Sequence, residues 1–89
     1  MSRKLTPDEL EFRDLARTYV ERNGIKNDLN RIAKLGRLTI FFYQGLIDVA
    51  DYDAGLYIFD ERSGFAEVDY KPYMERFRNA LILDRLADA

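Results

Sequence analysis

The 89-residue sequence contains no cysteine, no histidine and no tryptophan. Without cysteine there is no disulfide scaffold, no thiolate nucleophile and no thiolate zinc site. Without histidine the chain lacks the commonest metal ligand in proteins and the side chain that most often acts as a general base near neutral pH. These absences predict a protein that is not an enzyme and that holds no metal and no cofactor.

Long hydrophobic runs are also missing. The longest apolar stretch, residues 38–50, is interrupted by Gln44, Gly45 and Asp48 and is shorter than the roughly 20 residues that a membrane-spanning helix needs. No hydrophobic segment follows the first residues, so we expect no signal peptide. With 47% hydrophobic and 34% charged residues, the composition is that of a soluble folded protein. We expect one domain over residues 1–89, located in the cytoplasm and without a membrane partner.

The first predicted element is a helix over residues 7–23. Thr6 and Glu9 form the pattern of a capping box, in which each side chain accepts a hydrogen bond from the backbone N–H of the other residue. Pro7 suits the first helical position, and Gly24 suits the end of a helix. Apolar residues then recur on one helical face, which predicts that this face packs on the rest of the domain.

Residues 27–50 predict a second, long and central helix that begins at Asn27. In helical projection Asn30, Lys34 and Asp48 fall in one narrow polar strip, and the remaining faces are mostly apolar. The alternative is a short helix, a break near Gly36 and then a strand, because residues 38–43 are rich in β-branched and aromatic side chains. We prefer the long helix on the periodicity.

The second half of the chain predicts a loop over residues 51–55, a β-hairpin and a C-terminal helix. The hairpin strands span residues 56–60 and 65–70, and Gly64 suits a left-handed turn position between them. The acidic loop does not match a calcium-binding loop, because Arg62 stands where a bidentate carboxylate is required. The predicted fold class is therefore α+β, with two N-terminal helices, a hairpin and a C-terminal helix.

Negative charge is concentrated around the predicted hairpin. Residues 46–69 contain seven acidic residues and Arg62 as the single basic one. In the predicted register, three aromatic side chains share one strand face with three carboxylates. The residues of this predicted partner-binding face are Tyr57, Phe59, Glu61, Phe65, Glu67 and Asp69. A register that differs by one residue would turn the rings inward instead.

An exposed face that combines aromatic rings with carboxylates predicts binding to a basic protein surface. We therefore expect a small non-enzymatic interaction module, an adaptor or a stoichiometric inhibitor. The size and the charge are compatible with phage-encoded anti-defence proteins that inhibit nucleic-acid enzymes, which is an association and rests on no motif.

Two alternative functions follow from other residues. A DNA-binding regulator would use Arg31, Lys34 and Arg37 along one side of the second helix, although the acidic hairpin makes nucleic acid an unfavourable partner. A homodimer or larger homo-oligomer would form through apolar residues of the C-terminal helix, which otherwise pack on the first helix. These oligomer-contact residues are Ile82, Leu83 and Leu86.

Overall fold

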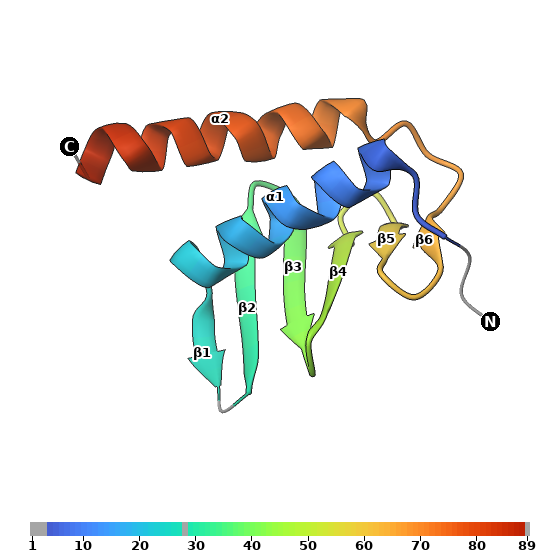
Figure 1. Cartoon of the computed structure of the whole chain (residues 1–89), viewed down its shortest axis with the longest axis horizontal. Helices are drawn as coiled ribbons and strands as arrows, with labels where there is room; N and C mark the ends of the chain where they lie inside the picture. Colours follow the sequence, from blue (N-terminus) through green and yellow to red (C-terminus); the bar gives the residue numbers. More distant parts are fainter. Residues whose placement is uncertain (1–3, 28, 89) are drawn as a thin grey trace.

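The chain folds as a helix, a six-stranded antiparallel sheet and a second helix (Figure 1). The computed structural model describes residues 4–27 and 29–88. Each strand pairs with the next one along the chain, so the sheet is a simple meander in the order β1 to β6. The elements are α1 (Pro7–Asn23), β1 (Ile25–Asn27), β2 (Asn30–Leu35), β3 (Leu38–Tyr43), β4 (Leu46–Asp51), β5 (Leu56–Asp60), β6 (Gly64–Phe65) and α2 (Lys71–Asp88).

The predicted long central helix is wrong, because the segment after α1 forms the strands β1 to β4. Two tight turns divide this segment into short strands. Gly36 has a φ of 59° between β2 and β3, and Gln44 and Gly45 have φ values of 50° and 85° between β3 and β4. Consecutive residues with positive φ form a turn whose twist matches that of antiparallel strands. The strand that we had weighed as the alternative for residues 38–43 does form, as β3.

The two helices match their predicted positions. α1 begins at the capping box, in which the Glu9 backbone N–H donates to Thr6 Oγ1 (3.2 Å) and the Thr6 backbone N–H donates to Glu9 Oε1 (3.0 Å). α2 begins at Lys71, as expected from Pro72 in its first turn. The class therefore remains α+β, but the arrangement is helix, sheet, helix and not two helices followed by a hairpin and a third helix.

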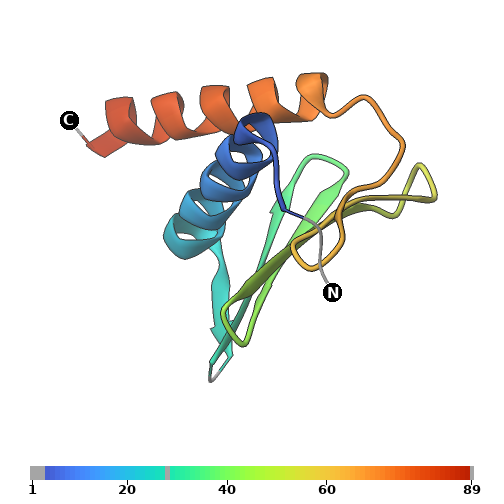
Figure 2. The ribbon, with the colours of Figure 1, turned by 45° about the vertical axis from the view of Figure 1, so that its right-hand side comes forward.

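The core lies between α1 and one face of the sheet, and α2 packs across α1 (Figure 2). Phe12, Ala16 and Val20 form the buried face of α1, and Met74 and Phe77 are the buried residues of α2. We call the sheet side that meets α1 the covered face. Its inward residues are Ala33, Ile40, Ile47, Val49 and Phe59.

The opposite side of the sheet, which we call the open face, carries no helix within the described residues. Strand pairing places alternate residues on it, because successive side chains of a strand point to opposite faces. Ile32 pairs with Phe41, and Phe41 pairs with Asp48, so these three side chains form one row across β2, β3 and β4. The other residues of the open face are Ile25, Asn27, Asn30, Lys34, Thr39, Tyr43, Leu46, Ala50, Tyr57 and Asp60.

The predicted hairpin differs from the structure in its second strand and in its register. β5 has the predicted bounds, whereas β6 contains only Gly64 and Phe65. Between β4 and β5 the register shifts at a β-bulge, since Val49 pairs with Phe59 but Ala50 pairs with Tyr57. One extra residue in a strand reverses the alternation of the side chains beyond it. Tyr57 and Phe59, which we expected on one face, therefore lie on opposite faces of the sheet.

Candidate functional site

The aromatic residues of the predicted partner-binding face do not form one surface. Phe59 is fully buried, and its ring centroid lies 5.7 Å from that of Phe12 in α1. The Phe65 ring packs against Phe12 at 4.9 Å and stacks on Tyr70 at 4.1 Å. Tyr57 is 39% exposed and lies on the open face. The prediction that the three rings are exposed together is therefore wrong for Phe59 and Phe65, whose rings pack against Phe12.

The acidic residues of that predicted face are also separated. Glu61 is largely buried and holds the sheet to α1, since Arg17 Nη2 lies 3.2 Å and Arg13 Nη1 lies 3.5 Å from its Oε1 atom. Asp69 accepts a hydrogen bond from the backbone N–H at the start of α2, and Glu67 is exposed in the preceding segment. Glu61 thus has a structural role, and the six predicted residues lie in different environments.

The three basic residues of the nucleic-acid alternative do not form the predicted helical strip. Arg31 donates to a backbone carbonyl in the last turns of α1. Lys34 is on the open face, where its Nζ atom donates to Thr39 Oγ1 at 2.7 Å. Arg37 lies in the turn between β2 and β3, with its Nη2 atom 3.3 Å from Oδ2 of the fully buried Asp51. These side chains point in different directions and present no common basic surface.

The three apolar residues near the end of α2 are exposed. Ile82 is 53%, Leu83 65% and Leu86 67% exposed. Figure 1 shows the second half of α2 extending beyond the sheet. The packing on α1 that we weighed for these residues is therefore not found, and oligomer contact through them stays a prediction.

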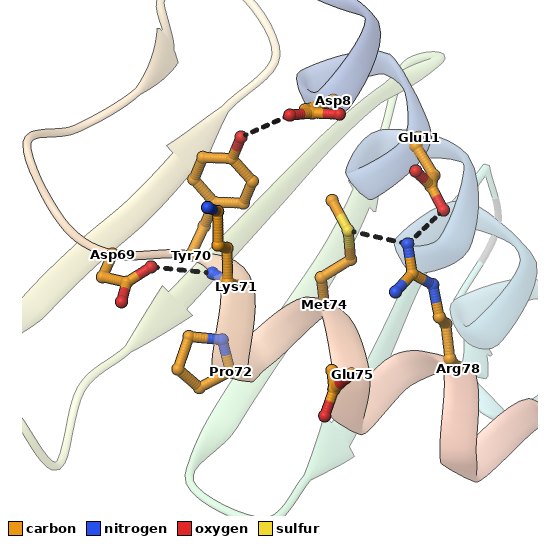
Figure 3. A pocket seen from close by; sticks show the side chains of 9 residues that line it. All are labelled: Asp8, Glu11, Asp69, Tyr70, Lys71, Pro72, Met74, Glu75 and Arg78. Carbon is orange, nitrogen blue, oxygen red and sulfur yellow. Dashed lines mark hydrogen bonds and ion pairs between the residues drawn. The ribbon is translucent and has the colours of Figure 1, made fainter.

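A cavity of about 540 Å³ lies between the beginnings of the two helices (Figure 3). Its polar walls are bonded to one another. The Tyr70 hydroxyl donates to Asp8 (3.3 Å), and the Arg78 guanidinium donates to Glu11 and to the Met74 sulfur. Tyr70, Asp8, Arg78 and Glu11 thus use hydrogen bonds within the walls of this cavity.

The open face has an apolar half over β1, β2 and β3. Ile25 is 74% exposed, Ile32 is 39% exposed and Tyr43 is 49% exposed, and Phe41 is half-buried among them. A shallow hollow of about 250 Å³ lies here. It is lined by these four residues together with Asn27, Asn30, Arg31 and Phe42. Large apolar side chains that gather on one uncovered face are typical of a contact surface.

The other half of the open face is a cluster that we call the tyrosine–aspartate corner. Its residues are Asp48, Tyr52, Tyr57 and Asp60. Tyr57 hydrogen-bonds to the Asp48 carboxylate, and Asp60 is the cross-strand neighbour of Asp48. The Tyr52 ring, from the turn after β4, packs edge-on against Phe41 with 6.4 Å between centroids.

The electrostatics of this corner centre on Asp48. Burial raises the pKa of the Asp48 carboxyl above its usual value, and the nearby Asp60 charge raises it further. The hydrogen bond from Tyr57, a backbone hydrogen bond at Glu61 and the Arg62 charge lower it, but the net shift is upward. Burial and the Asp48 charge raise the pKa of the Tyr57 hydroxyl in turn. Asp48 Oδ1 is buried and has no hydrogen-bond partner among the residues that the structure describes. Asp48 is thus a carboxylate whose ionisation the fold disfavours.

The open face escaped the sequence prediction because its residues are recognisable as a group only once three strands are paired. Phe41, Tyr43 and Asp48 are separated by intervals that place them on one side of a hairpin. In the helical projection Phe41 and Asp48 fell in one strip, but Tyr43 fell on another side, so this common surface could not be predicted.

Comparison with protein-family models, curated proteins and solved structures finds no match for this chain. Within residues 4–27 and 29–88, no three carboxylates come together as a metal-binding group. Neither helix, over its described residues, has the length and apolar character required to cross a bilayer. The function must therefore be argued from the geometry of the surfaces.

Proposed function

We propose that the protein is a non-enzymatic interaction module that docks the open face of its sheet on another protein. The observation that carries this proposal is the side-chain content of a sheet face with no helix over it. Ile25, Ile32, Tyr43 and Tyr57 are each at least 39% exposed on that face. Aromatic and aliphatic side chains of this size supply most of the binding energy when a partner removes them from water.

Charge indicates the chemistry of the partner. Asp60 lies 3.7 Å from the guanidinium Nε of Arg62, whereas Asp48 forms no ion pair among the described residues, although the Arg62 charge also acts on it. A partner protein with a basic side chain opposite Asp48 complements this carboxylate.

The size of the open face indicates a complex of moderate affinity. Five strands of three to six residues, at about 3.3 Å per residue and about 4.8 Å apart, give a face of roughly 400 Å². A standard protein–protein interface buries about 800 Å² on each partner. The neighbouring turns would have to contribute the rest, as Tyr52 does beside Phe41. An adaptor or a stoichiometric inhibitor with a reversible contact fits these dimensions.

The proposal is tested with two matched substitutions of exposed isoleucines. Ile32→Lys places a positive charge in the centre of the open face, and Ile82→Lys places the same charge on α2, away from it. A partner captured by the wild-type protein from the cells that produce it is purified, and its Kd is measured for both variants. We expect Ile32→Lys to weaken binding at least about tenfold, as loss of a central apolar contact does, and Ile82→Lys to bind like the wild type.

Hydrogen exchange of the purified complex then locates the contact. Protection by the partner is expected in β2, β3 and β4, with the end of α2 unchanged. Equal binding by Ile32→Lys and the wild type, or protection confined to α2, would overturn the proposal. Circular dichroism of both variants confirms that a loss of binding is not a loss of folding.

A further inference from the structure

Asp48 forms no ion pair among the described residues, unlike the other buried or partly buried carboxylates that hold the fold together. Glu61 has Arg13 and Arg17, and Asp51 has Arg37. Asp48 has hydrogen bonds from the Tyr57 hydroxyl and the Glu61 backbone and lies within the field of Arg62, but its Oδ1 atom has no hydrogen-bond partner among the described residues. A partly desolvated carboxylate without an ion pair is costly to the fold, so its presence on an uncovered face calls for a physical explanation.

Aromatic rings surround this carboxylate on the open face. Tyr57 lies beside it on β5, and Phe41 is its direct cross-strand neighbour on β3. Tyr52 extends this wall, because its ring packs edge-on against Phe41. The faces of aromatic rings attract cations, and a carboxylate beside them adds charge attraction and an acceptor. The corner thus combines the two kinds of group that bind an organic cation.

We propose that Asp48 receives a lysine side chain of the partner protein, with the rings of Tyr57, Phe41 and Tyr52 around its methylene chain. An ammonium group fits better than a guanidinium group. A bidentate arginine contact needs both carboxylate oxygens, and Oδ1 of Asp48 is buried. The Asp60 carboxylate, next to Asp48 across the strands, adds to the attraction. This inference rests on the proposed function, since it names what the partner inserts at the open face.

The first experiment uses a small probe and the full chain. Nα-acetyl-lysine amide is titrated into the protein at constant ionic strength, and backbone and aromatic resonances are followed by NMR. We expect saturable shifts at Asp48, Tyr57 and Tyr52. Nα-acetyl-norleucine amide, which has no charge, should leave these resonances unchanged.

Two isosteric variants show whether the Asp48 charge is responsible. Asp48→Asn should weaken binding of the lysine amide by about fivefold or more, the upper range of a partly exposed ion pair. Asp53→Asn removes the same charge from the nearby exposed turn and should have no effect. Shifts centred on the cavity residues Asp8 and Asp69, or equal binding by Asp48→Asn, would overturn the proposal. Tighter binding of the corresponding arginine amide would overturn the choice of an ammonium group.

The captured partner separates this inference from the proposed function. Loss of partner binding in Ile32→Lys together with full binding by Asp48→Asn would keep the open face as the docking surface and refute the lysine site. Binding of the lysine amide at Asp48 together with unchanged partner binding in Ile32→Lys would keep the cation site and refute the proposed function.

Discussion

The two faces of the sheet use adjacent residues of the same strands in different ways. On the covered face Ile40 and Phe59 are fully buried against α1 and α2. On the open face Phe41, which follows Ile40, and Tyr57, which lies two residues before Phe59, have no helix over them within the described residues, and neither has Asp48. The covered face thus stabilises the fold, whereas the open face leaves large side chains such as Tyr57 partly exposed to solvent.

The largest expected difference between the faces lies at Tyr57 and Phe59, which are two residues apart. Phe59→Ala removes a buried ring between Phe12 and Phe65 and should lower the free energy of unfolding by about 3–5 kcal/mol. Tyr57→Ala removes a ring that is 39% exposed and should cost about 1 kcal/mol or less. Urea unfolding followed by circular dichroism measures both values. Similar losses in the two variants would mean that the bulge in β5 does not separate these side chains.

A smaller effect is expected at Asp51, a buried carboxylate at the end of the sheet near α2. It accepts hydrogen bonds from the backbone N–H of Ala54 (3.0 Å) and from the Tyr73 hydroxyl (3.2 Å), and it pairs with Arg37. Asp51→Ala leaves these donors without an acceptor and should cost about 3 kcal/mol. Asp53→Ala, in the exposed turn, is the matched control. A thermal unfolding midpoint equal in both variants would contradict this role of Asp51.

The helices could be predicted from sequence because their signals are local. The capping box of Thr6 and Glu9 and the glycine after Asn23 fix α1 without reference to any other segment. The strands could not be predicted in this way. The row of Ile32, Phe41 and Asp48 across β2, β3 and β4 exists only because these strands pair with one another. Short apolar runs are ambiguous between helix and strand by periodicity alone, and the tertiary pairing decided the outcome.

The sequence did not predict which residues share the open face. Of the six residues of the predicted partner-binding face, Tyr57 lies on it, beside the carboxylates of Asp48 and Asp60, which were not among the six. Phe59 and Glu61 do not, because the register shift between Val49 and Ala50 reverses the alternation within β5. A β-bulge of one residue leaves no clear signature in this sequence. It is enough to exchange the two faces for every residue on one side of it.

The smallest expected change in stability is at Asp48 on the open face. Replacing this residue should raise the stability at pH 7, whereas replacing Phe59 on the covered face should lower it. Burial raises the pKa of the Asp48 carboxyl in the folded protein above its value in the unfolded chain, which is about 4. The folded state therefore binds this proton more tightly. The resulting stability is fully present below about pH 4 and is lost as pH rises through the folded-state pKa.

Asp48→Asn keeps the shape of the side chain and cannot ionise. At pH 7 the variant should therefore be more stable than the wild type, by less than about 1 kcal/mol because Asp48 is partly exposed and solvent screens its charge. This gain should shrink as pH falls toward 4, which urea midpoints between pH 3.5 and 7.5 can measure. A wild type that is the more stable protein at pH 7 would mean that Asp48 is already compensated within the fold. A gain in stability combined with loss of lysine amide binding would instead show that the open face gives up stability for recognition.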